Sequence, residues 1–253
     1  MKSPIVDQNA FVSGMVLKEL IPKGSIVESF LLYAGEMELS LSSKDRLVIA
    51  HTNKYSVYEF WWMAKNRTKQ IASLAQEILP GLTEDILYRL QDDWMSQRDP
   101  AYRSALFYIL NRCSSNGRVT CGKIDKAKLS PITINRFKNM TIENLHLILD
   151  KSDDVHNSFS GHNIKSDFRF FPVGHFGLNL LDAGSHGATD QAYLNHDRLY
   201  RQLLKADAKW IILYKYHKKV IEKYKGYNII MNDAYGNRTR QIDNCEDIIV
   251  TNF

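Results

Sequence analysis

Hydrophobic positions near the beginning of the chain alternate between helical and strand-like spacing. Segment 11–21 has apolar residues at helical intervals and stops at Pro22-Lys23-Gly24. The β-branched run 25–30 and the apolar run 46–50 are typical of strands, with a helical stretch between them. Residues 55–66 predict a further helix, which Trp61 and Trp62 are expected to pack onto a sheet.

The hydrophobic pattern is mostly helical in the middle of the chain, and predicted strands and helices alternate again toward its end. Residues 67–150 read as helical segments broken at Pro80-Gly81 and Pro100, which predicts an inserted subdomain. Predicted strands follow at 177–181, 209–214, 227–231 and 247–251, and predicted helices at 194–206 and 217–225. The pattern favours an α/β domain formed by residues 1–66 and 151–253, with helices on both faces of its sheet and a mostly helical insertion at 67–150.

The composition bears on where the protein is located and on whether it binds a membrane or a metal. No apolar run approaches the roughly 20 residues of a membrane-spanning helix, and the first residues lack the apolar core of a secretion signal. We therefore expect a cytoplasmic protein without a membrane partner. Cys113, Cys121 and Cys245 form an odd set without ligand spacing, which favours reduced thiols and no zinc. Nothing fixes a metal geometry for His175, His186 and His196 or for Asp154, His156 and His162, so no metal is expected.

Positive charge is concentrated in one part of the chain. The net charge is +5, yet the window 101–140 contains eight basic residues and a single acidic one, Asp125. A local positive field in a nearly balanced protein is typical of a surface that meets phosphates. A solvated surface that only aids solubility is the alternative interpretation.

Several short strings occur in an order that resembles one enzyme family. They are Phe107-Tyr108-Ile109-Leu110-Asn111-Arg112 followed by Asn116-Gly117, Asn195-His196-Asp197-Arg198-Leu199, Lys209-Trp210-Ile211-Ile212-Leu213-Tyr214, and Asp247-Ile248-Ile249-Val250-Thr251-Asn252. Along nearly the whole chain this order resembles the Dam-like, adenine-specific DNA methyltransferases. The resemblance implies a Rossmann-like methyltransferase sheet, S-adenosylmethionine as methyl donor, and an inserted DNA-recognition subdomain that carries a β-hairpin.

The positions that bind the methyl donor in this family depart from its pattern. Ser13-Gly14-Met15 stands where the family has Gly-Gly-Lys, so the lysine is absent. The family's glycine-rich turn corresponds to Glu28-Ser29-Phe30-Leu31-Leu32-Tyr33, in which Leu32 and Tyr33 are expected to fill the space of the cofactor. His51-Thr52-Asn53 replaces an acidic string, and a neutral imidazole cannot replace a carboxylate acceptor. The resemblance thus implies degenerate cofactor positions at Glu28, Phe30, Leu32, Tyr33, His51 and Asn53, and no bound cofactor.

The family's catalytic D-P-P-Y segment is also absent. The corresponding string after the predicted strand 177–181 is Asp182-Ala183-Gly184-Ser185, which leaves Asp182 as a vestigial position without the stacking ring or the rigid turn. The six prolines include no adjacent pair, so no D-P-P-Y occurs elsewhere. We therefore expect no catalytic residue.

The DNA-reading part of the family pattern is better preserved. Asn116-Gly117 is a type I′ turn signal, and Arg118-Val119-Thr120-Cys121 is a candidate returning strand of a hairpin. Arginine grips phosphate or guanine, and neutral polar side chains contact the backbone of the duplex. The predicted DNA contacts are Asn111, Arg112, Ser114, Ser115, Asn116, Arg118, Lys123, Lys126, Lys128 and Arg136.

Three functions remain open at this point. The first is a catalytically inactive homologue that binds double-stranded DNA or a protein partner. The second is an active, site-specific, S-adenosylmethionine-dependent DNA adenine methyltransferase with divergent motifs. The third is a regulatory or structural subunit of another enzyme. Relatives of such proteins occur in phages and in restriction-modification systems, but the residues assign this chain to neither.

Overall fold

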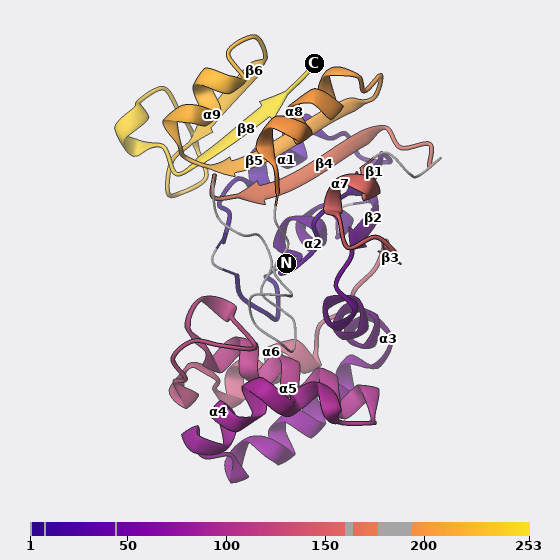
Figure 1. Ribbon diagram of the computed structural model, residues 1–253, viewed down its shortest axis with the longest axis vertical. Coiled ribbons are helices and arrows are strands. Elements are labelled where there is room, and N and C mark those ends of the chain that lie inside the picture. Colours follow the sequence, from indigo (N-terminus) through magenta and orange to yellow (C-terminus); the bar gives the residue numbers. More distant parts are fainter. Residues whose placement is uncertain (1, 8, 44, 160–163, 177–193) are drawn as a thin grey trace.

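The computed structural model describes residues 2–7, 9–43, 45–159, 164–176 and 194–253. Within these ranges the chain forms an eight-stranded sheet with a group of helices at one end (Figure 1). The strands are β1 (Ile26–Ser29), β2 (Leu47–Thr52), β3 (Leu145–Leu149), β4 (Phe168–Gly174), β5 (Lys209–Lys215), β6 (Asn228–Asn232), β7 (Arg238–Thr239) and β8 (Asp247–Thr251). The helices are α1 (Gly14–Leu20), α2 (Glu36–Ser42), α3 (Tyr55–Ile78), α4 (Glu84–Asp93), α5 (Pro100–Cys113), α6 (Pro131–Lys138), α7 (Val155–Ser158), α8 (His196–Leu204) and α9 (Lys218–Lys223).

The strand order is β3-β2-β1-β4-β5-β8-β6-β7, with parallel pairing from β3 to β5 and antiparallel pairing around β8. The connections run outward in opposite directions from β1 and β4. Because such crossovers are right-handed, α2 and α3 cover one face of the sheet while α8 and α9 cover the other. The predicted fold class, a Rossmann-like α/β sheet with helices on both faces and a helical insertion, is confirmed.

The predicted start of the insertion coincides with a break in a helix. The helical course of α3 continues on both sides of Arg67, but Arg67 itself has non-helical torsions (φ −140°, ψ 37°). α3 packs with α5 and α6, and α4 packs with α5. Phe60 of α3, Phe107 and Phe137 form one aromatic cluster, and Trp94 packs edge-on against Phe107. We call residues 67–144 the helical subdomain. The predicted end at 150 is too late, because Leu145–Leu149 return to the sheet as β3.

Two strand predictions need correction or fall outside the described residues. The strand next to β1 is Phe168–Gly174, which the sequence pattern missed, whereas the predicted strand 177–181 lies outside the described residues. The predicted hairpin is wrong: Asn111–Cys113 still belong to α5, a 3₁₀ turn spans Ser115–Gly117, and one antiparallel bridge joins Ser114 to Ile124. Trp61 packs in the core as predicted, but Trp62 is 43% exposed.

The beginning of the chain crosses the gap between the sheet and the helical subdomain, where Figure 1 places the N-terminus. We call residues 2–12 the N-terminal segment. The Ser3 hydroxyl donates to the Ala34 carbonyl, and Asn9 accepts a hydrogen bond from the His175 backbone N–H at 3.1 Å. Further along, Asp247 Oδ2 accepts from the backbone of Val12 at 2.7 Å. No helix in the described part of the chain is long and apolar enough to cross a bilayer.

Candidate functional site

A large cavity of about 1010 Å³ opens at the carboxyl ends of the central strands. Its walls come from the N-terminal segment, from the residues that follow β1, and from α5 and α6 of the helical subdomain. In open α/β sheets ligands bind outside the carboxyl ends of the strands where the winding reverses, and here the reversal lies between β1 and β4. The large cavity therefore occupies the expected ligand position of this fold, and its volume matches that of small-molecule sites.

The walls of the large cavity carry opposite charges. Glu36 and Glu38 line the side formed by α2, whereas Arg112 and Arg136 line the side formed by the helical subdomain. Burial raises the pKa of Glu38, although a hydrogen bond from the Ser29 hydroxyl at 2.8 Å acts in the opposite direction. Burial likewise raises the pKa of Glu36. Within the described residues, the buried Nε of Arg112 has no hydrogen-bond partner.

The turn after β1 shows how this chain replaces a glycine-rich loop. Leu31 has φ 67°, a left-handed conformation that glycine adopts at much lower cost. Leu32 is fully buried, and its backbone N–H donates to the His51 carbonyl at 2.8 Å. The Tyr33 hydroxyl donates to the Gly117 carbonyl at 2.7 Å. Tyr33 therefore lines the large cavity without filling it, which corrects the predicted role of Leu32 and Tyr33.

A second cavity, at the ends of β1, β2 and β3, is very small, with a volume of about 10 Å³. The Phe30 ring lies between His51, with ring centroids 4.9 Å apart, and Phe171, also at 4.9 Å. Phe159 packs edge-on against Phe30 at 5.3 Å. Asn53, the remaining predicted cofactor position, lines the same space. This volume admits about one water molecule. Phe30 and Phe159 therefore occupy the space beside Asn53.

Beneath the small cavity, His51 lies between two carboxylates. Its Nε2 is 3.4 Å from Glu28 Oε1, and its Nδ1 is 3.1 Å from Asp150 Oδ1. Arg169 Nε approaches the other Glu28 oxygen at 3.5 Å. Burial lowers the pKa of His51, but the hydrogen bonds to Asp150 and Glu28 outweigh burial and raise it overall. Glu28 and His51 thus form part of a buried charge network, in which the two neighbouring acids favour the protonated form of the imidazole.

The end of β4 lacks an acidic residue. Pairing with β1 ends at Phe170, and the chain continues through Pro172, Gly174 and His175. Pro172 is tolerated because its nitrogen faces the side from which β1 has departed. Gly174 has φ 81°, and a Cβ there would meet the Asn9 side chain at 2.2 Å. The predicted vestigial position Asp182 lies outside the described residues and eight positions beyond this strand end.

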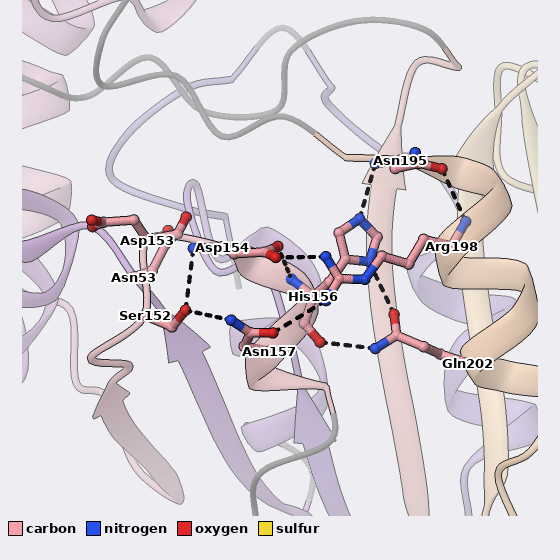
Figure 2. A network of polar contacts seen from close by, with 9 residues as sticks. All are labelled: Asn53, Ser152, Asp153, Asp154, His156, Asn157, Asn195, Arg198 and Gln202. Carbon is pink, nitrogen blue, oxygen red and sulfur yellow. Dashed lines mark hydrogen bonds and ion pairs between the residues drawn. The ribbon is translucent and has the colours of Figure 1, made fainter.

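A polar network joins the loop after β3 to the start of α8 (Figure 2). His156 Nε2 accepts from the Asn195 backbone N–H at 3.0 Å, and its Nδ1 lies 2.9 Å from Gln202 Oε1. Asp154, which caps α7, forms an ion pair with Arg198 at 2.5 Å. These pairings give Asp154 and His156 structural roles. No group of three or more His, Cys, Asp or Glu side chains among the described residues is arranged to hold a metal, and the three cysteines are free thiols.

The predicted DNA contacts divide into buried and exposed residues. Asn111 and Ser114 are buried, so their predicted contact with DNA is wrong. Lys126 donates to the Leu82 carbonyl at 2.6 Å and is partly committed to the fold, while Ser115 is half-buried. The side chain of Asn116 lies outside the described part. The exposed members are Arg118, Lys123, Lys128 and Arg136.

Several residues of the site were not found from the sequence. Asp150 directly follows the apolar string Leu145–Leu149. An acidic residue directly after a strand-like run could have identified it as a candidate site residue. Phe159, Glu36 and Glu38 have no comparable local signal, because only the tertiary fold brings them to the two cavities.

No family model and no curated protein matches the chain. Among solved structures, an rRNA methylase from Streptococcus thermophilus is 15% identical over 94% of this chain and 92% of its own, with a TM-score of 0.38. A SAM-dependent methyltransferase from Agrobacterium tumefaciens is 10% identical over 96% of this chain, with a TM-score of 0.40, and this chain spans 62% of its length. A precorrin-6y C5,15-methyltransferase from Geobacter metallireducens is 10% identical over 92% of this chain and 82% of its own, with a TM-score of 0.30. At these identities and scores the likeness carries no information on substrate, and the fold assignment stands on the strand order.

Proposed function

We propose that this protein is a catalytically inactive homologue of the DNA adenine methyltransferases that binds double-stranded DNA through its helical subdomain. The observation that carries DNA binding is the group of exposed cations on this subdomain, Arg118, Lys123, Lys128 and Arg136. Arg136 lines the large cavity together with the half-buried Arg112, whose Nε has no partner among the described residues. Exposed guanidinium and ammonium groups in one region supply the phosphate contacts that dominate affinity for DNA.

The absence of catalysis is supported by the ends of β1, β2 and β4. Phe30 and Phe159 occupy the space beside Asn53, and His51 is held between Glu28 and Asp150 instead of offering a free carboxylate. The residues from Pro172 to Phe176 at the end of β4 include no acid. A flipped adenine would find no carboxylate acceptor in this described stretch.

Duplex binding is tested with a triple variant, Arg118→Ala, Lys123→Ala and Lys128→Ala, followed by fluorescence anisotropy over a series of salt concentrations. We expect affinity to fall at least about tenfold and the slope of log affinity against log salt to become shallower by about one unit per lost contact. The matched control removes two exposed lysines in and after α9, Lys219→Ala and Lys225→Ala, and should keep both values. Equal losses in the two variants would refute a specific role of the helical subdomain.

One observation favours a second candidate, an active or cofactor-binding methyltransferase. The large cavity beside Tyr33 is big enough for a nucleoside-sized ligand, and Glu36 and Glu38 offer acceptors there. This candidate requires the donor to bind in the large cavity without using the space beside Asn53, which is too small for part of a ligand. Binding of S-adenosylmethionine that is lost in Glu38→Gln would support it.

A further inference from the structure

The large cavity lies between two layers of the molecule whose side chains there carry opposite charges. Glu36 and Glu38 belong to α2, which packs on β2 of the sheet, whereas Arg112 and Arg136 belong to α5 and α6 of the helical subdomain. The N-terminal segment also lines the cavity, in the gap that separates the two layers in Figure 1. A ligand that contacts both walls therefore needs an anionic group at one end and hydrogen-bond donors at the other.

The cationic wall includes a donor that the described residues leave unsatisfied. The Nε of Arg112 is buried and has no hydrogen-bond partner among them. An unpaired buried donor on a charged group costs more free energy than a neutral one, and an anion at the guanidinium would offset that cost. Arg136, which is exposed on α6, lines the same cavity. Two guanidinium groups on one wall match a phosphate monoester, which carries about two negative charges at neutral pH.

The acidic wall is held in place by contacts with the rest of the fold. Glu38 is 2% exposed, and its Oε1 accepts a hydrogen bond from the Ser29 hydroxyl at 2.8 Å. Trp61 Nε1 donates to the Tyr33 carbonyl at 2.7 Å, just before α2 begins. Gly35, which precedes α2, has φ 66°, and a Cβ there would lie 2.7 Å from the Trp61 ring. The carboxyl groups of this wall are therefore preorganised to accept hydrogen bonds from ligand hydroxyl or amine groups.

We propose that the large cavity binds a phosphate monoester of a small molecule, of the size of a nucleoside monophosphate. Its phosphate contacts Arg112 and Arg136, and its hydroxyl or amine groups donate to Glu36 and Glu38. The cavity volume of about 1010 Å³ accommodates such a ligand, and the Phe137 side chain in the wall supplies an apolar surface for a flat ring. The site would add a small-molecule ligand to the proposed DNA binding and does not depend on it.

Equilibrium dialysis of the full chain with adenosine monophosphate, adenosine and inorganic phosphate tests the proposal. We expect adenosine monophosphate to bind at least about tenfold more tightly than the other two, because each of those engages a single wall. Arg112→Gln and Arg136→Gln should each weaken the binding of adenosine monophosphate about tenfold and leave that of adenosine unchanged. Glu36→Ala should weaken the binding of both adenosine compounds alike and leave that of inorganic phosphate unchanged. The matched control, Arg89→Gln at an exposed position of α4 outside the cavity, should bind all three as the wild type does.

The outcomes separate this site from the proposed DNA surface. Arg118, Lys123 and Lys128 do not line the large cavity, so their triple alanine variant should retain its affinity for adenosine monophosphate whether or not it binds DNA. Arg136→Gln, at an exposed position, carries the test if Arg112→Gln fails to fold. Equal affinity of the wild type for adenosine monophosphate and adenosine, or arginine variants that bind like the control, would overturn the proposal. Loss of duplex binding in both arginine variants, with no binding of adenosine monophosphate to the wild type, would assign the two arginines to DNA instead.

Discussion

Asn111 on α5 and Val6 in the N-terminal segment exchange two hydrogen bonds. The Val6 N–H donates to Asn111 Oδ1 at 2.7 Å, and Asn111 Nδ2 donates to the Val6 carbonyl at 3.0 Å. The same amide nitrogen donates to the Gly117 carbonyl at 2.8 Å. One buried amide thus joins the N-terminal segment to the helical subdomain beside the large cavity, which explains why this residue is unavailable to DNA.

Removing that amide should destabilise the fold. Asn111→Ala removes both hydrogen bonds to the Val6 backbone and one of the two that the Gly117 carbonyl accepts, so we expect a loss of about 2 to 4 kcal/mol in the free energy of unfolding. Urea denaturation measures it. Asn135→Ala, at an exposed position of α6, is the matched control and should change stability by less than about 0.5 kcal/mol. Equal stability of the two variants would show that the amide contacts have no energetic weight.

The charge network around His51 predicts pH-dependent stability. The pKa of His51 is raised in the folded state, so the folded protein binds this proton more tightly than the unfolded chain, whose histidine titrates near pH 6.5. The stabilisation is therefore fully present below about pH 6.5 and is lost as pH rises through the folded pKa. Urea midpoints measured across this range should fall for wild type. In His51→Gln this fall of the urea midpoint with rising pH should be absent. If the variant kept the wild-type dependence of the midpoint on pH, His51 would not be its cause.

His156 predicts a pH dependence of stability opposite to that of His51. Burial and the nearby Arg198 lower the pKa of His156, and its Nε2 accepts the Asn195 N–H only when it is unprotonated. Stability from this residue is present above about pH 6.5 and is lost as pH falls through the lower folded pKa. The protection of the Asn195 amide against hydrogen exchange, relative to its intrinsic rate at each pH, should fall on acidification. Protection in His156→Gln should lack this acid-dependent decrease, and an identical pH dependence of protection in both proteins would exclude His156 as the cause.

The aromatic residues at the small cavity should contribute strongly to stability. Phe159 is 5% exposed and packs against Phe30, Phe171 and His156. Phe159→Ala removes these contacts and leaves a void, so we expect a loss of about 3 kcal/mol in the free energy of unfolding. Phe159→Leu retains most of the volume and should lose less. Thermal and urea denaturation distinguish the two, and similar small losses would mean that the cavity collapses without cost.

The sequence predicted the alternation of strands and helices but missed β3, β4 and β7. β7 has two residues, too few to give a strand pattern. β1, β2, β5, β6 and β8 are marked by compact β-branched or apolar runs. β4 carries Arg169 and Pro172, which weaken a strand pattern, and their tolerance depends on Glu28 and on the early end of β1. β3 is also a short apolar run, but the prediction assigned it to the insertion 67–150. Its membership of the sheet depends on pairing with β2, a contact between distant parts of the chain.

The candidate site was predictable only in part. Departures from the glycine-rich turn directed attention to the residues after β1, but the sequence could not give their side-chain directions: Tyr33 turns toward Gly117, and Phe30 toward His51. The turn signal at Asn116-Gly117 suggested a hairpin. The apolar spacing of α5 continues to Cys113, however, and these residues form the end of the helix instead of a strand. Local turn propensity is weak compared with the burial of a helix face.

Titration calorimetry with S-adenosylmethionine tests the central claim most directly, because the proposed function requires a chain that does not bind the methyl donor. The small volume of the cavity beside Asn53 and the positions of Phe30 and Phe159 predict no heat of binding. Saturable binding with micromolar affinity would contradict the account and would favour a methyltransferase with divergent motifs.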